Sequence, residues 1–230
     1  MSISALIWLN DHSFIASTSD GVIRIYQTSG AAVFRIFRGH SPGEIPQIQL
    51  NSSRKTLISA SEDMTARIWN VTPLKSIVNS DKQEMEPAEG SVGGQSGQDC
   101  LAVLRGHTSD LWEAAWCPSS DGSLEKLVAT YVLTIFISLA LNISRCSTDH
   151  TTRIWEATSG KCLKIIEDHR VTSVQTQPPV PAMSISPSGK YIATASGSHN
   201  TLYIHSLEVS PGRLEHLVQL TCFLELPTRF

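Results

Sequence analysis

Short runs of β-branched and aromatic residues alternate with polar residues along most of the chain, and Gly, Asn, Asp and Ser bound these runs. An apolar-polar period of two is typical of half-buried β-strands. No stretch of the sequence has a convincing amphipathic helical period. The pattern therefore predicts an all-β fold, and its clearest strands are residues 33–37, 47–50, 55–59, 66–69 and 162–166.

Three segments repeat one pattern, and they lie at residues 17–26 (STSDGVIRIY), 59–69 (SASEDMTARIW) and 146–155 (CSTDHTTRIW). Each has an Asp six residues before a final aromatic, in the pairs Asp20 and Tyr26, Asp63 and Trp69, and Asp149 and Trp155. A weaker fourth copy spans residues 191–206, with Asn200 near the Asp position and Ser206 near the aromatic position. A second landmark recurs as Arg-Gly-His, Arg-Gly-His and Glu-Asp-His, ending at His40, His107 and His169.

These ordered pairs resemble the repeats of the WD-repeat β-propeller family, and the resemblance covers most of the chain. It implies about four short antiparallel strands per repeat, which form one propeller blade. We therefore expect a single partial propeller across residues 1–230, about four blades of a seven- or eight-blade ring. Its blades are expected at residues 1–38, 39–105, 106–167 and 168–220.

The spacing of the landmarks predicts two insertions. His40 and His107 are 67 residues apart, whereas one WD repeat takes roughly 40–45. Residues 72–98 are rich in Gly, Ser, Glu and Gln and have no apolar period, so we expect a flexible surface loop there.

The second insertion is apolar and lies at residues 131–145. Deleting it joins residues 127–130 to Cys146, which restores the repeat and puts Thr130 in the place of Ser59. We interpret these residues as a translated intron. A genuine surface insertion and a membrane span are the alternatives. The uncharged apolar stretch that overlaps the insertion, residues 127–143, has 17 residues, which is at the lower edge of membrane-spanning length.

The family resemblance also implies a buried hydrogen-bond network in each blade, made by a His, a strand hydroxyl, a turn Asp and a strand Trp. The residues it assigns to this network are His40, Ser59, Asp63 and Trp69 in the second repeat, His107, Thr130, Asp149 and Trp155 in the third, and Asp20 in the first. A metal site or acid–base chemistry is the competing interpretation. Recurrence at blade spacing, without convergence on one place, favours the structural role.

Composition narrows the function classes. Eighteen basic and 21 acidic residues give a net charge of −3, so there is no general basic field for nucleic acid or anionic membranes. The five cysteines form no Cys-x-x-Cys pair, which disfavours a disulfide framework and fits a reducing compartment. The N-terminal residues lack the features of a secretory signal. No nucleophile-elbow, P-loop or metal-ligand spacing occurs, so we expect no enzyme activity, catalytic residue, metal or cofactor.

A narrower resemblance, carried by SEDMTARIW, residues 110–119 and SPSGKYIATAS, is to the transducin-β-like co-repressor family. It implies a non-catalytic scaffold in a nuclear co-repressor complex with a histone deacetylase, binding co-repressor subunits or histone tails. The alternatives are a substrate receptor or assembly scaffold in ubiquitin ligation and a cytoplasmic Gβ-like adaptor. Four blades also need an oligomer or further blades to close a ring. The residues we expect to contact partners are Glu44, Glu62, Asp110, Trp112 and Thr148.

Overall fold

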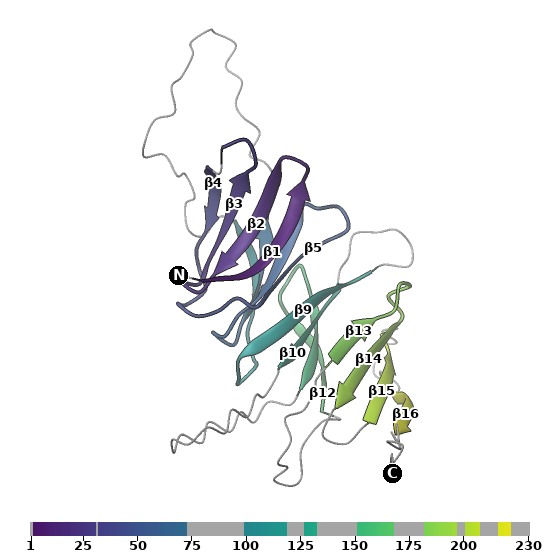
Figure 1. The fold of residues 1–230 in the computed structure, drawn as a ribbon. Coiled ribbons are helices and arrows are strands. Elements are labelled where there is room, and N and C mark those ends of the chain that lie inside the picture. The colour runs from purple at the N-terminus through teal and green to yellow at the C-terminus, as the bar shows by residue number, and fades with distance from the viewer. Residues whose placement is uncertain are drawn as a thin grey trace, which may run out of the picture.

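The computed structural model describes residues 2–30, 32–72, 99–118, 127–132, 151–167, 182–196, 201–207 and 216–221. Every regular element in these ranges is a β-strand, and the strands form four antiparallel sheets of four strands each (Figure 1). Within each sheet the strands pair in chain order. The predicted all-β fold is therefore confirmed.

The first two sheets come from the N-terminal part of the chain. The first contains β1 (Ile3–Asn10), β2 (Ser13–Thr18), β3 (Val22–Gln27) and β4 (Val33–Phe37). The second contains β5 (Gln47–Leu50), β6 (Thr56–Ala60), β7 (Ala66–Asn70) and β8 (Cys100–Leu104). Trp69 on β7 pairs with Cys100 on β8, so residues 73–98, which lie outside the described ranges, are inserted between two neighbouring strands.

The last two sheets follow the same plan. The third contains β9 (Leu111–Cys117), β10 (Leu127–Val132), β11 (Thr152–Glu156) and β12 (Cys162–Ile166). The fourth contains β13 (Ala182–Ile185), β14 (Tyr191–Ser196), β15 (Thr201–Ser206) and β16 (His216–Thr221). Strand β10 continues through Tyr131 and Val132, the first two residues of the segment interpreted as an intron. Residues 133–150 lie outside the described ranges, so that interpretation stays a prediction.

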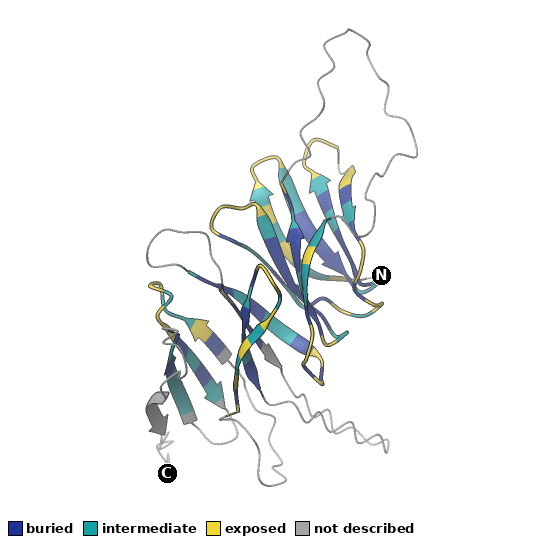
Figure 2. Cartoon of the chain, turned by 180° about the vertical axis from the view of Figure 1, so that it is seen from behind, coloured by how far each residue is buried: buried dark blue, intermediate teal, exposed yellow. Residues whose placement is uncertain are grey.

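The hydrophobic core lies between neighbouring sheets, and the second and third sheets bury both of their faces in it (Figure 2). Neighbouring residues on a strand point to opposite faces. On β6, Leu57 therefore packs against the first sheet while Ile58 packs against the third. The first strands of successive sheets also contact one another, β1 with β5, β5 with β9, and β9 with β13.

Polar contacts supplement the apolar packing between sheets. Arg35 on β4 forms an ion pair of 2.5 Å with Asp99, just before β8, and its side chain is only 5% exposed. Its guanidinium also donates to the carbonyl of Thr72. Farther along, the side-chain oxygens of Gln47 and Gln49 accept hydrogen bonds from β9 of the third sheet. These contacts fix how neighbouring sheets are aligned.

A bulge marks the same position in all four sheets. The pairing of the third strand with the fourth shifts just before Tyr26, Trp69, Trp155 and His205. The fourth sheet therefore carries His205 at the aromatic position, next to Ser206, which the sequence placed near that position. Asn200 lies outside the described residues. Within those residues no helix has the length and apolar character needed to cross a membrane.

Candidate functional site

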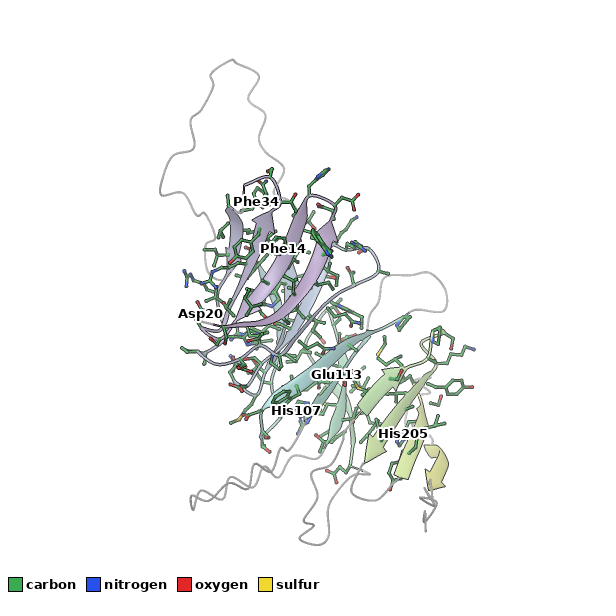
Figure 3. The ribbon with its side chains drawn as sticks, in the orientation of Figure 1. Phe14, Asp20, Phe34, His107, Glu113 and His205 are labelled. Carbon is green, nitrogen blue, oxygen red and sulfur yellow. The ribbon has the colours of Figure 1, made fainter. Side chains whose placement is uncertain are left out.

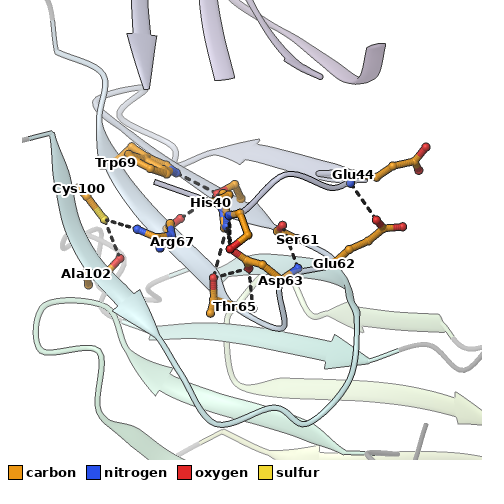
Figure 4. Close-up of polar contacts among 12 residues, drawn as sticks. His40, Glu44, Ser61, Glu62, Asp63, Thr65, Arg67, Trp69, Cys100 and Ala102 are labelled. Carbon is orange, nitrogen blue, oxygen red and sulfur yellow. Dashed lines mark hydrogen bonds and ion pairs between the residues drawn. The ribbon is translucent and has the colours of Figure 1, made fainter. Parts of the chain in front are cut away.

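Four residues of the second sheet form one buried hydrogen-bonded chain (Figure 4). Trp69 Nε1 lies 2.9 Å from Ser59 Oγ, which lies 2.7 Å from His40 Nε2. On the other side of the ring, His40 Nδ1 lies 2.8 Å from Asp63 Oδ2. Strands β6 and β7 supply Ser59 and Trp69, the turn between them supplies Asp63, and the segment before β5 supplies His40.

The charges of this network follow from its burial. Burial lowers the pKa of His40, and the neighbouring carboxylate of Asp63 does not offset it, so the imidazole is neutral at pH 7. Burial alone would raise the pKa of Asp63. Hydrogen bonds from His40, Thr65 and the Ser41 amide outweigh that effect and hold this pKa well below its usual 3.8. The imidazole therefore donates from Nδ1 to the carboxylate and accepts the Ser59 proton at Nε2.

The Gly of the Arg-Gly-His landmark allows this close packing. At Gly39, with φ of 159°, a Cβ atom would lie 2.7 Å from Arg67 Nη1 and 3.1 Å from Trp69 Cη2. At Gly106, with φ of 147°, a Cβ would lie 2.6 Å from Arg153 Nη1. A side chain at either position would displace the end of this Arg side chain and would need a φ that L-residues rarely adopt, so Gly suits both landmarks for the same reason.

The third sheet repeats the arrangement with a threonine. His107 Nε2 lies 2.7 Å from Thr130 Oγ1, and Trp155 Nε1 donates to the same oxygen at 2.8 Å. The ring centroids of His107 and Trp155 are 6.1 Å apart, close to the 5.9 Å between His40 and Trp69. Thr130 thus takes the place of Ser59. Asp149 lies outside the described residues.

The first sheet has a different polar cluster around Asp20. Arg24 Nη2 forms an ion pair of 2.7 Å with Asp20 Oδ2, and the Thr18 hydroxyl and the Val22 amide also donate to this carboxylate. The hydrogen bond from Arg24 is the largest influence, and together with that from Thr18 it holds the pKa of Asp20 well below its usual 3.8, although burial opposes this. Ala16 occupies the position of the network hydroxyl, since it pairs with Arg24 as Ser59 pairs with Arg67.

The order Ser59, His40, Asp63 is that of a hydrolase triad, but its setting here is structural. A catalytic serine must present its oxygen to a substrate. Ser59 has no exposed surface, and its oxygen already accepts from Trp69. The described residues contain no cluster of three His, Cys, Asp or Glu that could hold a metal ion.

Two residues expected to contact partners, Glu44 and Glu62, are held together at the edge of the second sheet. The Glu44 amide donates to Glu62 Oε2 at 2.9 Å, and the Glu62 amide donates to the Glu44 carbonyl at 3.0 Å. Both side chains extend away from the buried network (Figure 4). Glu44 is exposed and Glu62 is half-buried.

Asp110 and Trp112 stand at the start of β9. Asp110 is exposed, and Trp112 is the extra residue of a bulge, because Glu113 pairs with Tyr131 and Leu111 with Val132. Bulges redirect the side chains that they carry. Burial raises the pKa of the neighbouring carboxyl of Glu113 (Figure 3). Sequence reasoning did not select this group. Thr148 lies outside the described residues.

Backbone contacts join these loops into one edge of the molecule. Asp20 forms a parallel bridge with Gly43, beside Glu44. The Leu111 amide, beside Asp110, donates to the Ser61 carbonyl at 3.1 Å, beside Glu62. The loops of three successive sheets therefore form one continuous edge. We call the part that carries Glu44, Glu62 and Asp110 the acidic edge, because the carboxylate of Asp20 is paired with Arg24. Sequence reasoning missed the bridging residues, because nothing in the repeats identifies contacts between loops.

The family model described as "WD domain, G-beta repeat" (WD40) matches residues 1–27, 32–70, 98–156 and 160–206. The THO complex subunit 3 of Arabidopsis thaliana is 29% identical over 133 residues, which cover 58% of this chain and 30% of that protein. The WD40 repeat-containing protein HOS15 of the same plant is 25% identical over 186 residues, 81% of this chain and 23% of that protein. The chain thus spans under a third of the length of these curated relatives.

Solved structures agree on the fold. A chain in the crystal structure of a mitotic checkpoint complex has a TM-score of 0.61 at 18% identity, covering 96% of this chain and 52% of that chain. The C-terminal WD40 domain of Sif2 has a TM-score of 0.55 at 22% identity, covering 88% of this chain and 42% of that chain. The expected partial propeller is confirmed, and the narrower resemblance to transducin-β-like proteins stays a prediction.

Proposed function

Because the chain belongs to the WD40-repeat family, whose members are typically protein-interaction scaffolds, we propose that it is a non-catalytic scaffold within a multiprotein assembly. One observation carries the proposal. The recurring polar residues are buried in hydrogen bonds within the sheets, whereas the acidic side chains of Glu44 and Asp110 are exposed at the joined loop edge.

The chemistry of the edge favours a basic partner segment. Its carboxylates, those of Glu44, Glu62 and Asp110, come from adjacent loops, and clustered charge of one sign attracts a segment of the opposite sign. A Lys- or Arg-rich protein tail, such as a histone tail, has the right charge. With the sequence resemblance, this supports a subunit of a nuclear co-repressor and histone deacetylase complex as the specific form of the proposal.

Affinity purification from nuclear extract, followed by quantitative mass spectrometry, tests this. A double charge reversal, Glu44→Lys with Asp110→Lys, should lose the partners of the wild-type chain. Asp11→Lys is the matched control, because Asp11 is equally exposed but lies in the β1–β2 turn at the opposite edge. Enrichment of deacetylase subunits that depends on the acidic edge supports the proposal. Enrichment of ubiquitin-ligase adaptors, or partners unaffected by the double reversal, overturns it.

A further inference from the structure

The first sheet has one face against which no other described sheet packs. Strand pairing defines this face, which we call the open face, and its residues include Leu6, Trp8, Phe14, Ala16, Arg24 and Tyr26. Their opposite-facing neighbours, such as Ile15 and Ile25, are buried against the second sheet. On the open face Phe14 stacks on Tyr26 at 5.2 Å and meets Trp8 edge-on at 5.8 Å. Figure 3 labels Phe14 on the first sheet, near the turn between β1 and β2.

The same position in the other sheets shows what such a face is built to contact. The first strand of each sheet carries a large apolar residue at one equivalent position, where it pairs with the second strand. These equivalent residues are Trp8, Leu50, Trp116 and Ile185. Trp116 is 6% exposed, because the second sheet covers it and the Gln49 carbonyl accepts its indole hydrogen bond at 3.2 Å. Trp8 is 55% exposed. The open face therefore matches a face that, elsewhere in this chain, packs on a preceding sheet.

Among the described residues, the opposite face of the fourth sheet is less buried than the equivalent faces of the other sheets. Ala193 occupies the position of Ile15, Ile58 and Ala129, each of which has no exposed surface. Ala193 is only half-buried. Ile204 is likewise half-buried, whereas its counterpart Ile154 in the third sheet is 2% exposed. Both ends of the row of sheets thus carry the kind of face that the interior junctions bury.

We propose that the open face of the first sheet binds the outer face of the fourth sheet in a second copy of this chain. Each contact would repeat the junction that this chain makes between its own sheets. Two such contacts, related by a two-fold axis, would close eight sheets into a ring with no open face. The partner surface is then a small apolar patch centred on Ala193 and Ile204, with the exposed Ser184 where the second sheet has Gln49.

Size-exclusion chromatography with light scattering tests the proposal. The wild-type chain should have twice the 25.1 kDa of one chain. Trp8→Arg and Ala193→Arg should each weaken dimerisation at least about tenfold, since buried aromatic anchors dominate interfaces. Leu101→Arg is the matched control, because Leu101 is 52% exposed on β8 of the second sheet, away from both faces, and this variant should stay dimeric.

Mixing the two variants keeps the result interpretable. Each has one intact face of the complementary kind, so Trp8→Arg and Ala193→Arg should together restore a dimer through one junction. Far-UV circular dichroism checks that both remain folded. A monomeric wild-type chain would overturn the proposal and favour a preceding blade of a longer polypeptide as the occupant. Dimerisation of Ala193→Arg alone would overturn it in favour of a symmetric contact between two first sheets.

Discussion

Removing the hydroxyl of Ser59 should destabilise the second sheet. The Ser59 oxygen has two partners, His40 Nε2 and Trp69 Nε1, and both are buried. Ser59→Ala leaves an acceptor and a donor unpaired, at about 1–3 kcal/mol each. The free energy of unfolding should therefore fall by about 2–6 kcal/mol.

Urea denaturation followed by tryptophan fluorescence measures this change. Ser59→Thr is the matched control, because Thr130 performs the same two contacts in the third sheet. It should retain most of the stability. Ser53→Ala, in an exposed turn, should change nothing measurable. A loss below about 0.5 kcal/mol for Ser59→Ala would refute the reasoning, because leaving His40 Nε2 and Trp69 Nε1 buried without hydrogen-bond partners costs more than that.

Three further predictions follow from the network and the junctions. Burial holds the pKa of His40 below its usual 6.5 in the folded chain. As the pH falls, the imidazole of His40 is therefore protonated in the unfolded chain before it is protonated in the folded chain. Stability should therefore fall as the pH drops from about 7.5 to about 5.5, and His40→Gln should remove that part of the dependence in urea titrations. Asp99→Ala leaves the buried guanidinium of Arg35 without its ion-pair partner. It should lower the free energy of unfolding by about 1.5–3 kcal/mol in the same assay. Thr130→Val should lower the melting temperature and Thr130→Ser should not. Equal melting temperatures for the two variants would contradict the hydrogen-bond network of the third sheet.

The strand pattern and the repeats could be predicted because each blade is encoded locally. Three of the five clearest predicted strands match β4, β5 and β12 at both ends. Of the other two, β6 begins and ends one residue later than predicted, and β7 ends one residue later. The positions of Ser59 and Thr130 could be found because the hydroxyl stands at a fixed distance from the repeat landmarks.

Contacts between blades could not be predicted from the sequence. The ion pair of Arg35 with Asp99 joins residues 64 apart, across the segment of residues 73–98. The bridge of Asp20 to Gly43 depends on how two sheets sit side by side. The sequence placed the aromatic position of the fourth repeat only near Ser206, because this repeat has neither Trp nor Asp to anchor the alignment. The bulge before His205 fixes the register.

The residues that hold the sheets together are distinct from those proposed to bind a partner. Hydrogen–deuterium exchange of the chain, alone and with its co-purified partner, tests this distinction most directly. New amide protection is expected at residues 41–46, 61–65 and 108–110, the loops of the acidic edge. Protection confined to residues 11–12 and 51–55, the turns at the opposite edge, would contradict this distinction.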